Sequence, residues 1–408
     1  MSVAEAEPTG TDRLRRLGEP RSLAITGILL GVLAAWLSVP PFTLRNIVVP
    51  AAVAVLGAAL GLWALTRGER KLGWWAVGVA ALAILVALWF QSEESAELES
   101  VFSVGLLAAT LRFATPLAFA AIGGIFSERS GVVNIGLEGM MLAGAFFGIV
   151  VVAETGQWEL GILAAMGAGG VLALIHAFFS IHLQGDQIIS GFAINILALG
   201  LTGYLFRSIY STGGTPELEE RIPNVRLPLI EDIPFIGDVF GNLSLMIWVM
   251  FATVILAFIV LFKTPLGLRI RSVGEHPKAA DTVGISVFKV RYAAVILSGI
   301  LAALGGAYLS FGFGNAFNEN MTVGRGYIAL AAVIFGNWRP FGAFGACLLF
   351  GFSSALALRL QGSPLLPTEL ASANLLSTLP YVLTLVVLVG VIGRSRGPAA
   401  AGRPYVKQ

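Results

Sequence analysis

The sequence predicts an all-α integral membrane protein, a polytopic helical bundle with about 10–12 transmembrane helices. The chain of 408 residues is 56% apolar and 12% charged, which is about half the charge density of a soluble domain. Its mean hydropathy is +0.84. The apolar residues occur in runs of about 20, the length that crosses a bilayer as a helix. No run alternates polar and apolar residues over a strand length, which argues against a membrane β-barrel.

The chain divides into four predicted parts. Residues 1–21 form a polar cytoplasmic N-terminus, and residues 22–100 form a three-span N-terminal extension rich in Ala, Val and Leu. Residues 101–394 form the expected functional core, because their spans carry Gly, Asn, Gln, Glu and Pro. Residues 395–408 form a cytoplasmic tail. The predicted spans are 23–39, 47–66, 72–90, 101–126, 135–153, 160–181, 188–206, 243–262, 292–311, 321–336, 341–360 and 375–392.

The distribution of Lys and Arg predicts that both termini are cytoplasmic. With twelve crossings and the N-terminus inside, 19 Lys and Arg fall in inside segments and five in outside segments, which is the positive-inside pattern. The span 321–336 is the weakest, because its apolar part is short enough for a re-entrant segment. We expect it to cross, since a re-entrant segment would move Arg394 and Arg396 to the outside.

Polar residues in the core spans are candidates for a substrate pathway, because an ionisable group in a span costs a few kcal/mol. Glu138 is the clearest. Either it stabilises the first turn of a helix, with Arg129 as a partner, or it lines a polar path with Asn134, one helical turn earlier. Asn195 either bonds to a neighbouring helix, the more common role, or joins the same path.

A second group of candidates lies before and at the start of the span 321–336. Asn318 precedes Gly324-Arg-Gly, where Arg325 opens a helix whose first N–H groups have no partner in the helix. Such helix ends face the substrate in transporters, although most are simply helix starts. Phe311 and Tyr327 are nearby aromatic residues with faces on which a ring can stack. Residues 131–148 and 324–342 share a faint pattern of a Gly-flanked entry and an apolar helix, as inverted repeats do.

The motifs of enzymes are missing from the sequence. It has no Gly-x-x-x-x-Gly-Lys-Ser/Thr phosphate loop, no His-Glu-x-x-His and no Cys-x-x-Cys. Its single cysteine, Cys347, cannot form an internal disulfide. We therefore expect no enzymatic activity and no cofactor or metal bound by this chain. A pumping function has to draw its energy from a partner or an ion gradient.

Three stretches resemble the permease subunit of bacterial ABC importers, in the superfamily of branched-chain amino acid and simple sugar permeases. The resemblance covers roughly residues 101–394, and the stretches look like the nucleoside (guanosine-type) branch. They are SERSGVVNIGLEGM at 127–140, VGEHPKAADTVGI at 273–285 and NENMTVGRGYIALAAVIFGNWRP at 318–340.

The resemblance implies a multi-pass protein of the bacterial plasma (inner) membrane that translocates nucleosides by ATP-driven alternating access. It implies a second related permease, a cytoplasmic ABC ATPase that uses ATP, and an extracytoplasmic substrate-binding lipoprotein, with no nucleic acid as partner. The long inside loop 263–291 would carry the contact with the ATPase. Local signals predict a short helix there after Pro277, closed by Gly284. The coupling residues implied by the resemblance are Gly274, Glu275, Pro277, Ala280, Asp281 and Gly284.

The sequence leaves three alternatives open. A simple-sugar (ribose-type) ABC permease is the runner-up within the superfamily. An ion-coupled secondary transporter working alone requires a buried acid for the ion, and Glu138 is the one good candidate. A membrane scaffold without transport activity is the third, and the polar residues in the core spans argue against it.

Overall fold

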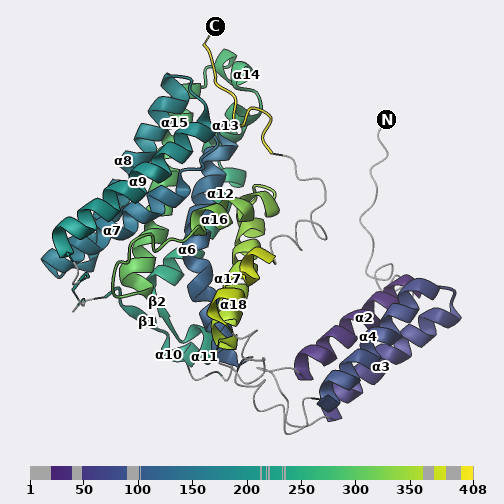
Figure 1. The fold of residues 1–408 in the computed structure, drawn as a ribbon. Coiled ribbons are helices and arrows are strands. Elements are labelled where there is room, and N and C mark those ends of the chain that lie inside the picture. The colour runs from purple at the N-terminus through teal and green to yellow at the C-terminus, as the bar shows by residue number, and fades with distance from the viewer. Residues whose placement is uncertain are drawn as a thin grey trace. The chain divides into compact units, whose positions relative to one another are not determined.

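The computed structural model describes residues 20–38, 48–89, 101, 103–211, 214–216, 218, 221–231, 233, 236–361, 372–382 and 397–407. The chain forms two compact units. Unit 1 comprises Met1–Gly105 with Gly362–Ala371, and unit 2 comprises Leu106–Gln361 with Ser372–Gln408. Helices dominate the described part (Figure 1), so the predicted all-α class is confirmed. The predicted domain limits at 100 and 394 stay a prediction.

Unit 1 is a bundle of three helices, α2 (Pro20–Ser38), α3 (Val48–Thr66) and α4 (Arg70–Trp89). Small residues bring the helices together, because hydrophobicity cannot drive association within lipid. A Cβ atom added at Gly27 would lie 2.8 Å from the carbonyl oxygen of Gly57, and one at Gly73 would lie 2.9 Å from that of Gly61. The three predicted N-terminal spans are therefore helices that contact one another through glycine.

Three central helices form the middle of unit 2: α6 (Val104–Arg129), α7 (Leu137–Thr155) and α15 (Val287–Ala307). Their most apolar stretches are 72%, 72% and 83% buried, against 33–39% for the long helices around them. Glycine again permits close approach, since a Cβ atom at Gly306 of α15 would collide with the backbone of α7 at Met141. The surrounding long helices are α8 (Trp158–Ala177), α9 (Gln187–Tyr210), α12 (Leu245–Lys263) and α17 (Pro340–Leu360).

Shorter elements complete unit 2. The π-helical turns η1 (Phe178–His182) and η2 (Tyr308–Phe313) extend α8 and α15. Between α9 and α12 lies a small antiparallel sheet that the sequence analysis missed, in which Val225 pairs with Leu243. The remaining short elements are β1 (Asn224–Arg226), α10 (Pro228–Glu231), α11 (Ile236–Phe240), β2 (Asn242–Ser244), α13 (Pro265–Glu275), α14 (Pro277–Thr282), α16 (Arg325–Phe335) and α18 (Ala373–Leu376).

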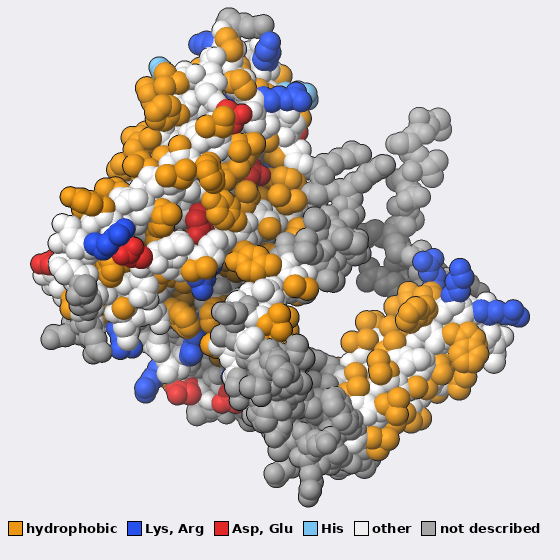
Figure 2. Space-filling view, viewed as in Figure 1, with side chains coloured by type: hydrophobic (Ala, Val, Ile, Leu, Met, Phe, Trp, Pro, Cys, Tyr) orange, Lys and Arg blue, Asp and Glu red, His pale blue; other side chains and the backbone are white. Residues whose placement is uncertain are grey.

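The helix lengths fit a membrane protein with many crossings. Within the described residues, nine helices are long and apolar enough to cross a bilayer, and two shorter apolar helices, Pro20–Ala35 and Arg325–Phe335, add to them. Apolar side chains cover the visible flank of unit 2, and Lys and Arg gather toward its ends (Figure 2). The cytoplasmic position of both termini stays a prediction. The last predicted span, 375–392, lies largely outside the described residues.

The predicted span 321–336 is wrong in its extent. Its helix, α16, has 11 residues, which rise about 16 Å, roughly half the hydrocarbon thickness of a bilayer. The four residues before it form turns, because Val323 and Gly324 have φ angles of +44° and +79° that a right-handed helix does not accept. An irregular segment and a half-length helix therefore replace the continuous helix.

Candidate functional site

Glu138 joins two helices that both begin inside unit 2. Its side chain lies in the first turn of α7 and is buried. One carboxylate oxygen accepts a hydrogen bond from the N–H of Gly324 at 2.7 Å, and the other accepts from the N–H of Gly326 at 2.5 Å. A helix start leaves these N–H groups without partners in the helix. Bonds from N–H groups to a charged acceptor are the stronger kind, so the start of α16 stabilises the buried carboxylate.

From this junction α7 and α16 run in opposite directions. Asn134 and Met141 contact Ser298 and Gly306, respectively, so α7 follows α15 away from the end of unit 2 that carries α13, α14 and the C-terminus (Figure 1). We call this end the α13–α14 end. The turn after α16, at Trp338, lies there instead. Two helix starts that meet and diverge are the arrangement of inverted repeats in transporters.

Asn195 of α9 connects both helix starts. Its Oδ1 accepts from the N–H of Gly139 at 2.8 Å, and its Nδ2 donates to the carbonyl of Ile135 at 3.0 Å and to the hydroxyl of Tyr327 at 2.9 Å. Both amide protons and one acceptor position are therefore used. The expectation that Asn195 bonds to a neighbouring helix is confirmed.

The last two residues of α6, Glu128 and Arg129, hold the opposite end of α16. The indole N–H of Trp338 donates to the carboxylate of Glu128 at 2.5 Å. The guanidinium of Arg129 donates to the carbonyls of Trp338 and Asn337 at 3.1 and 3.4 Å. The proposed pairing of Arg129 with Glu138 is thus wrong. Asn337 and Trp338 both have φ of +53°, a strained conformation for residues other than glycine.

The irregular segment between these two contacts is fixed from both sides. The carbonyl of Val133 faces Nε2 of the buried His176 at 3.1 Å, and its N–H donates to Oε1 of Gln187 at 2.7 Å. Asn134 is fully buried and donates to the hydroxyl of Ser298 at 3.0 Å. Because α7 begins only at Leu137, the prediction that Asn134 and Glu138 share a helical face is wrong.

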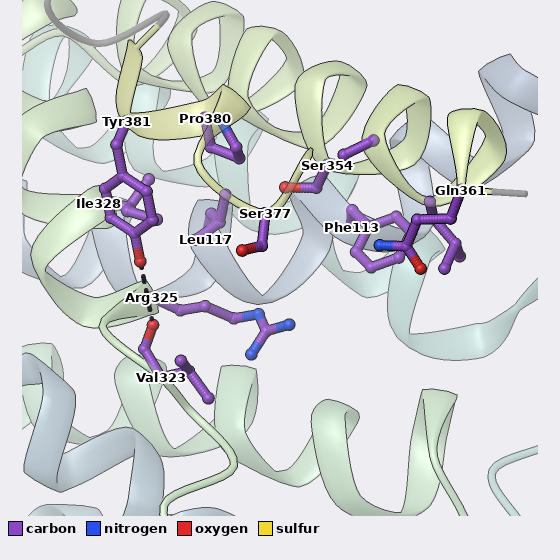
Figure 3. Close-up of a pocket in the computed structure, with 12 residues that line it drawn as sticks. Phe113, Leu117, Val323, Arg325, Ile328, Ser354, Gln361, Ser377, Pro380 and Tyr381 are labelled. Carbon is purple, nitrogen blue, oxygen red and sulfur yellow. Dashed lines mark hydrogen bonds between the residues drawn. The ribbon is translucent and has the colours of Figure 1, made fainter. Parts of the chain in front are cut away.

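A cavity of about 290 Å³ lies beside the start of α16. The guanidinium of Arg325 extends into it (Figure 3). The same group donates to the carbonyls of Met321 and Thr322 at 2.8 and 3.2 Å. The hydroxyl of Tyr381 reaches the carbonyl of Val323 at 3.5 Å. Other lining residues include Phe113, Leu117, Ile328, Ser354, Gln361, Ser377 and Pro380.

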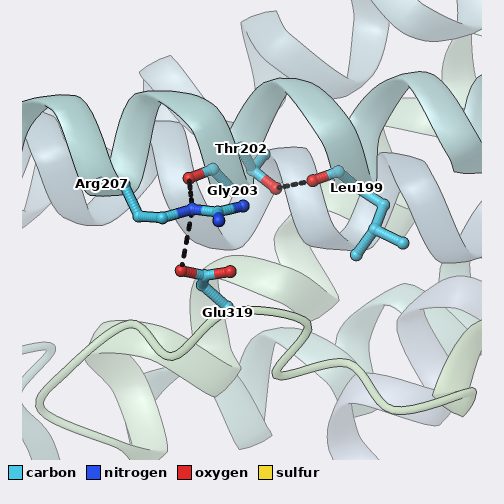
Figure 4. Close-up of polar contacts among 5 residues, drawn as sticks. All are labelled: Leu199, Thr202, Gly203, Arg207 and Glu319. Carbon is cyan, nitrogen blue, oxygen red and sulfur yellow. Dashed lines mark hydrogen bonds and ion pairs between the residues drawn. The ribbon is translucent and has the colours of Figure 1, made fainter.

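The loop before α16 is attached to α9. The guanidinium of Arg207 lies 3.3 Å from the carboxylate of Glu319 and donates to the carbonyl of Gly203 (Figure 4). The ring of Phe317, next but one along the chain, is buried against Phe206 and Phe146. These contacts fix the position from which the chain enters α16.

The structure brings together only some of the predicted pathway residues. Glu138, Asn195, Arg325 and Tyr327 gather at the start of α16, and the side chain of Tyr327 is 41% exposed. Phe311 is elsewhere. Its ring is fully buried and lies where Cβ atoms at Gly148 and Gly161 would be, so it has no open face for a substrate ring in this conformation. Asn318 is exposed in the loop next to Glu319.

The predicted coupling segment forms two short helices at the α13–α14 end. The predicted short helix is confirmed as α14, which Pro277 opens and after which Gly284 has φ of +84°. Ala280 is buried with Val273, Val287 and Tyr405. Gly274 lies against the carbonyl of Arg129, where a Cβ atom would collide with it.

A polytopic bundle in which two oppositely directed helices begin at one buried carboxylate has the architecture of a membrane transport protein. The chain matches the family described as branched-chain amino acid transport system / permease component over residues 106–392, and it belongs to this family. Its members are permeases, which are not enzymes themselves. Together with the apolar helices, this membership identifies a multi-pass protein of the bacterial plasma membrane.

Named relatives are similar over nearly their whole length. The guanosine ABC transporter permease protein NupQ of Bacillus subtilis is 45% identical over 312 residues, covering 74% of this chain and 96% of the relative. The nucleoside ABC transporter permease protein NupC of Lactococcus lactis is 40% identical, with the same coverage. The putative glucose ABC transporter permease protein TsgC13 of Haloferax volcanii is 39% identical over 70% of this chain and 91% of the relative.

More distant relatives include a second permease protein from the guanosine transporter and one from the nucleoside transporter, each 25% identical to this chain. No solved structure matches the chain. The family membership, the recognised resemblance and the multi-pass fold are thereby confirmed.

Proposed function

We propose that this chain is the permease subunit of an ABC importer that translocates nucleosides, with the energy supplied by ATP hydrolysis in a separate subunit. The observation that carries this proposal is the sequence identity of 45% to a guanosine permease and of 40% to a nucleoside permease. The stretches 127–140 and 318–340, singled out from the sequence, contact each other at both ends of α16. The two stretches recognised from the sequence therefore hold α16 at both ends. We call these contacts at the two ends of α16 the joint.

The joint offers a route from the coupling segment to the middle of the membrane. Gly274 of α13 contacts the backbone of Arg129, and the Arg129 side chain holds Trp338 at the end of α16. The far end of α16 bonds to Glu138. A helix of 11 residues is stiff and about 16 Å long. A movement of α13 and α14 that follows ATP binding would thus shift the start of α16, and such element shifts underlie alternating access.

The groups at the joint divide into two kinds. Each oxygen of Glu138 already accepts a backbone N–H, and Asn195 has used both of its amide protons. In this state they position the helices. Tyr327 has a partly exposed ring, and Arg325 extends into the cavity. These two are suited to meet a nucleoside, because an aromatic ring stacks on a base and a guanidinium donates to hydroxyl or carbonyl oxygens.

The proposal includes three partners: a second related permease, a cytoplasmic ATPase and an external substrate-binding lipoprotein. The occurrence of two permease proteins among the relatives named for guanosine transport, and two among those named for nucleosides, supports the permease pairing. ATP would be used by the ATPase alone. Both oxygens of Glu138 bond to backbone N–H groups, which gives this carboxylate a structural role at the start of α16.

The substrate can be tested in a strain that lacks the gene for this chain. We would compare uptake of radiolabelled guanosine, ribose and leucine before and after the gene is restored. We expect saturable guanosine uptake to return, with no change for ribose or leucine. Restoration of ribose uptake alone would replace the nucleoside by a simple sugar, the alternative favoured by the similarity to a putative glucose permease.

A further inference from the structure

The C-terminal segment 397–407 is fastened to the coupling helices. The N–H of Ala400 donates to the carbonyl of Gly274 at 2.9 Å, and the N–H of Ala399 donates to the carboxylate of Glu275 at 3.2 Å. Tyr405 is buried in the apolar cluster that contains Ala280 of α14. Burial, and then the neighbouring Asp281 carboxylate, raise the pKa of Tyr405.

The buried guanidinium of Arg291 also binds the C-terminal segment. Arg291 of α15 is fully buried. Its Nε donates to the carbonyl of Ser130 and its Nη1 donates to the carbonyl of Arg403, both at 3.2 Å. A buried charge is costly unless polar groups compensate it, and here the C-terminal segment supplies one of them. The segment is therefore an integral part of the α13–α14 end.

Between α14 and the C-terminal segment lies a groove of about 600 Å³. Lys278 lines one wall, and Arg403 and Val406 line the other. All three side chains are exposed. The acidic lining residue, Glu275, accepts a hydrogen bond from the N–H of Ala399. Lys278 and Arg403 outnumber this one carboxylate among the lining residues, so the groove keeps a positive surplus, which fits an acidic segment of a protein.

We propose that residues 399–406 of the C-terminal segment and α14 together form the docking groove for an acidic segment of the ATPase subunit. This inference rests on the proposed function and adds to it a wall of the interface that lies more than 110 residues away in the sequence. The contact with α14 makes the two walls one surface. A segment of the ATPase bound in this groove would contact the C-terminal segment and α14. It would be linked to α16 through Gly274, which lies against the backbone of Arg129.

Charge reversal of one exposed side chain tests the groove in the complete transporter. The variant Arg403→Glu changes only the groove lining, because the fold contact of this residue is made by its backbone carbonyl. Lys407→Glu is the matched control, since Lys407 is exposed on the same segment and is not among the residues that line the groove. We expect Arg403→Glu to weaken retention of the ATPase on the purified permease by about tenfold, and Lys407→Glu to change it by less than about twofold. Arg403→Lys should restore retention.

Photo-cross-linking separates this inference from the proposed function. A benzophenone maleimide would be attached to Val283→Cys at the end of α14 or to Ala399→Cys in the tail, each in a Cys347→Ala background. We expect both probes to cross-link to the ATPase. Cross-linking from position 283 but not from 399, with normal retention by Arg403→Glu, would overturn the groove and leave the proposed function intact. Failure of both probes to reach the ATPase would contradict the proposed function itself.

Discussion

The two ends of α16 are held by the same stretch of chain, 128–138, but by different kinds of contact. At its start, the carboxylate of Glu138 accepts two backbone N–H groups inside the membrane-spanning part of unit 2. At its end, Glu128 and Arg129 hold an indole and two carbonyls in a strained turn next to α13. The N–H groups at the start cannot turn to water when they lose their acceptor in the interior, whereas the partly exposed Arg129 at the end can.

Substitutions at the two ends of α16 should therefore have different effects. Loss of the contact at the start should impair the substrate pathway, and loss of the contact at the end should weaken the link between α16 and the ATPase. Substitutions at either end, together with one at the surface, therefore form a graded series. Each is measured in the complete transporter at matched amounts in the membrane.

The largest effect is expected for Glu138. Glu138→Ala leaves the N–H groups of Gly324 and Gly326 without their acceptors, at a cost of about 1–3 kcal/mol each. Uptake of guanosine should fall to below about 1% of the wild-type rate. Glu138→Gln keeps one acceptor oxygen and should retain roughly a tenth. The measurement is the initial rate of radiolabelled guanosine uptake.

The matched control for Glu138→Gln is Glu319→Gln, which neutralises an exposed carboxylate in the loop before α16. Wild-type uptake by Glu138→Ala would contradict a role for the Glu138 contacts in transport. Equal losses for both variants would show that charge in general, rather than the joint, is responsible.

The next effect is expected for Asn195, which supports both helix starts. Asn195→Leu removes three hydrogen bonds and should lower uptake by about tenfold. Tyr327→Phe removes only one of the three and should lower it by about threefold. A larger loss in Tyr327→Phe than in Asn195→Leu would indicate that the Tyr327 hydroxyl acts on the substrate rather than on the helix.

At the other end of α16, Trp338→Phe tests the link to the ATPase. It removes the bond to Glu128 and keeps a smaller aromatic ring. We expect guanosine uptake to fall by about threefold while ATP hydrolysis continues, so that more ATP is used for each nucleoside. A parallel fall in hydrolysis and uptake would place Trp338 with Glu138 and abolish the distinction between the ends.

The smallest effect is expected at the surface. The side chains of Arg207 and Glu319 are 70% and 42% exposed, and ion pairs of this kind contribute about 0–1 kcal/mol. Arg207→Gln should leave uptake within about twofold of the wild type. A tenfold loss would mean that the loop before α16 is under much greater constraint than its contacts indicate.

The sequence was informative where the signal is local. Pro277 and Gly284 define a short helix by their own backbone preferences, and α14 follows them closely. Glu138 was identified because an acid in an apolar run is costly. Its partners could not be identified, since they are backbone N–H groups 186 and 188 residues further along the chain. Arg129, its neighbour in sequence, bonds to a different turn.

Other features depended on packing that no local pattern encodes. Phe311 was expected near a substrate because it is aromatic, but it fills the space left by Gly148 and Gly161. The segment 130–136 lies between two helical patterns, and its position depends on contacts with residues far along the chain, among them His176, Gln187 and Ser298. The tail carried one signal, the aromatic Tyr405 in a polar stretch, which the sequence analysis did not use.

The central claim is that this chain moves nucleosides only when an ATPase acts on it. The most direct test reconstitutes the chain with its partner permease in proteoliposomes, with the ATPase present or omitted, and measures accumulation of labelled guanosine delivered by the binding protein. The account predicts ATP-dependent accumulation with the ATPase and none above empty vesicles without it. Accumulation driven by an ion gradient in the absence of the ATPase would contradict it.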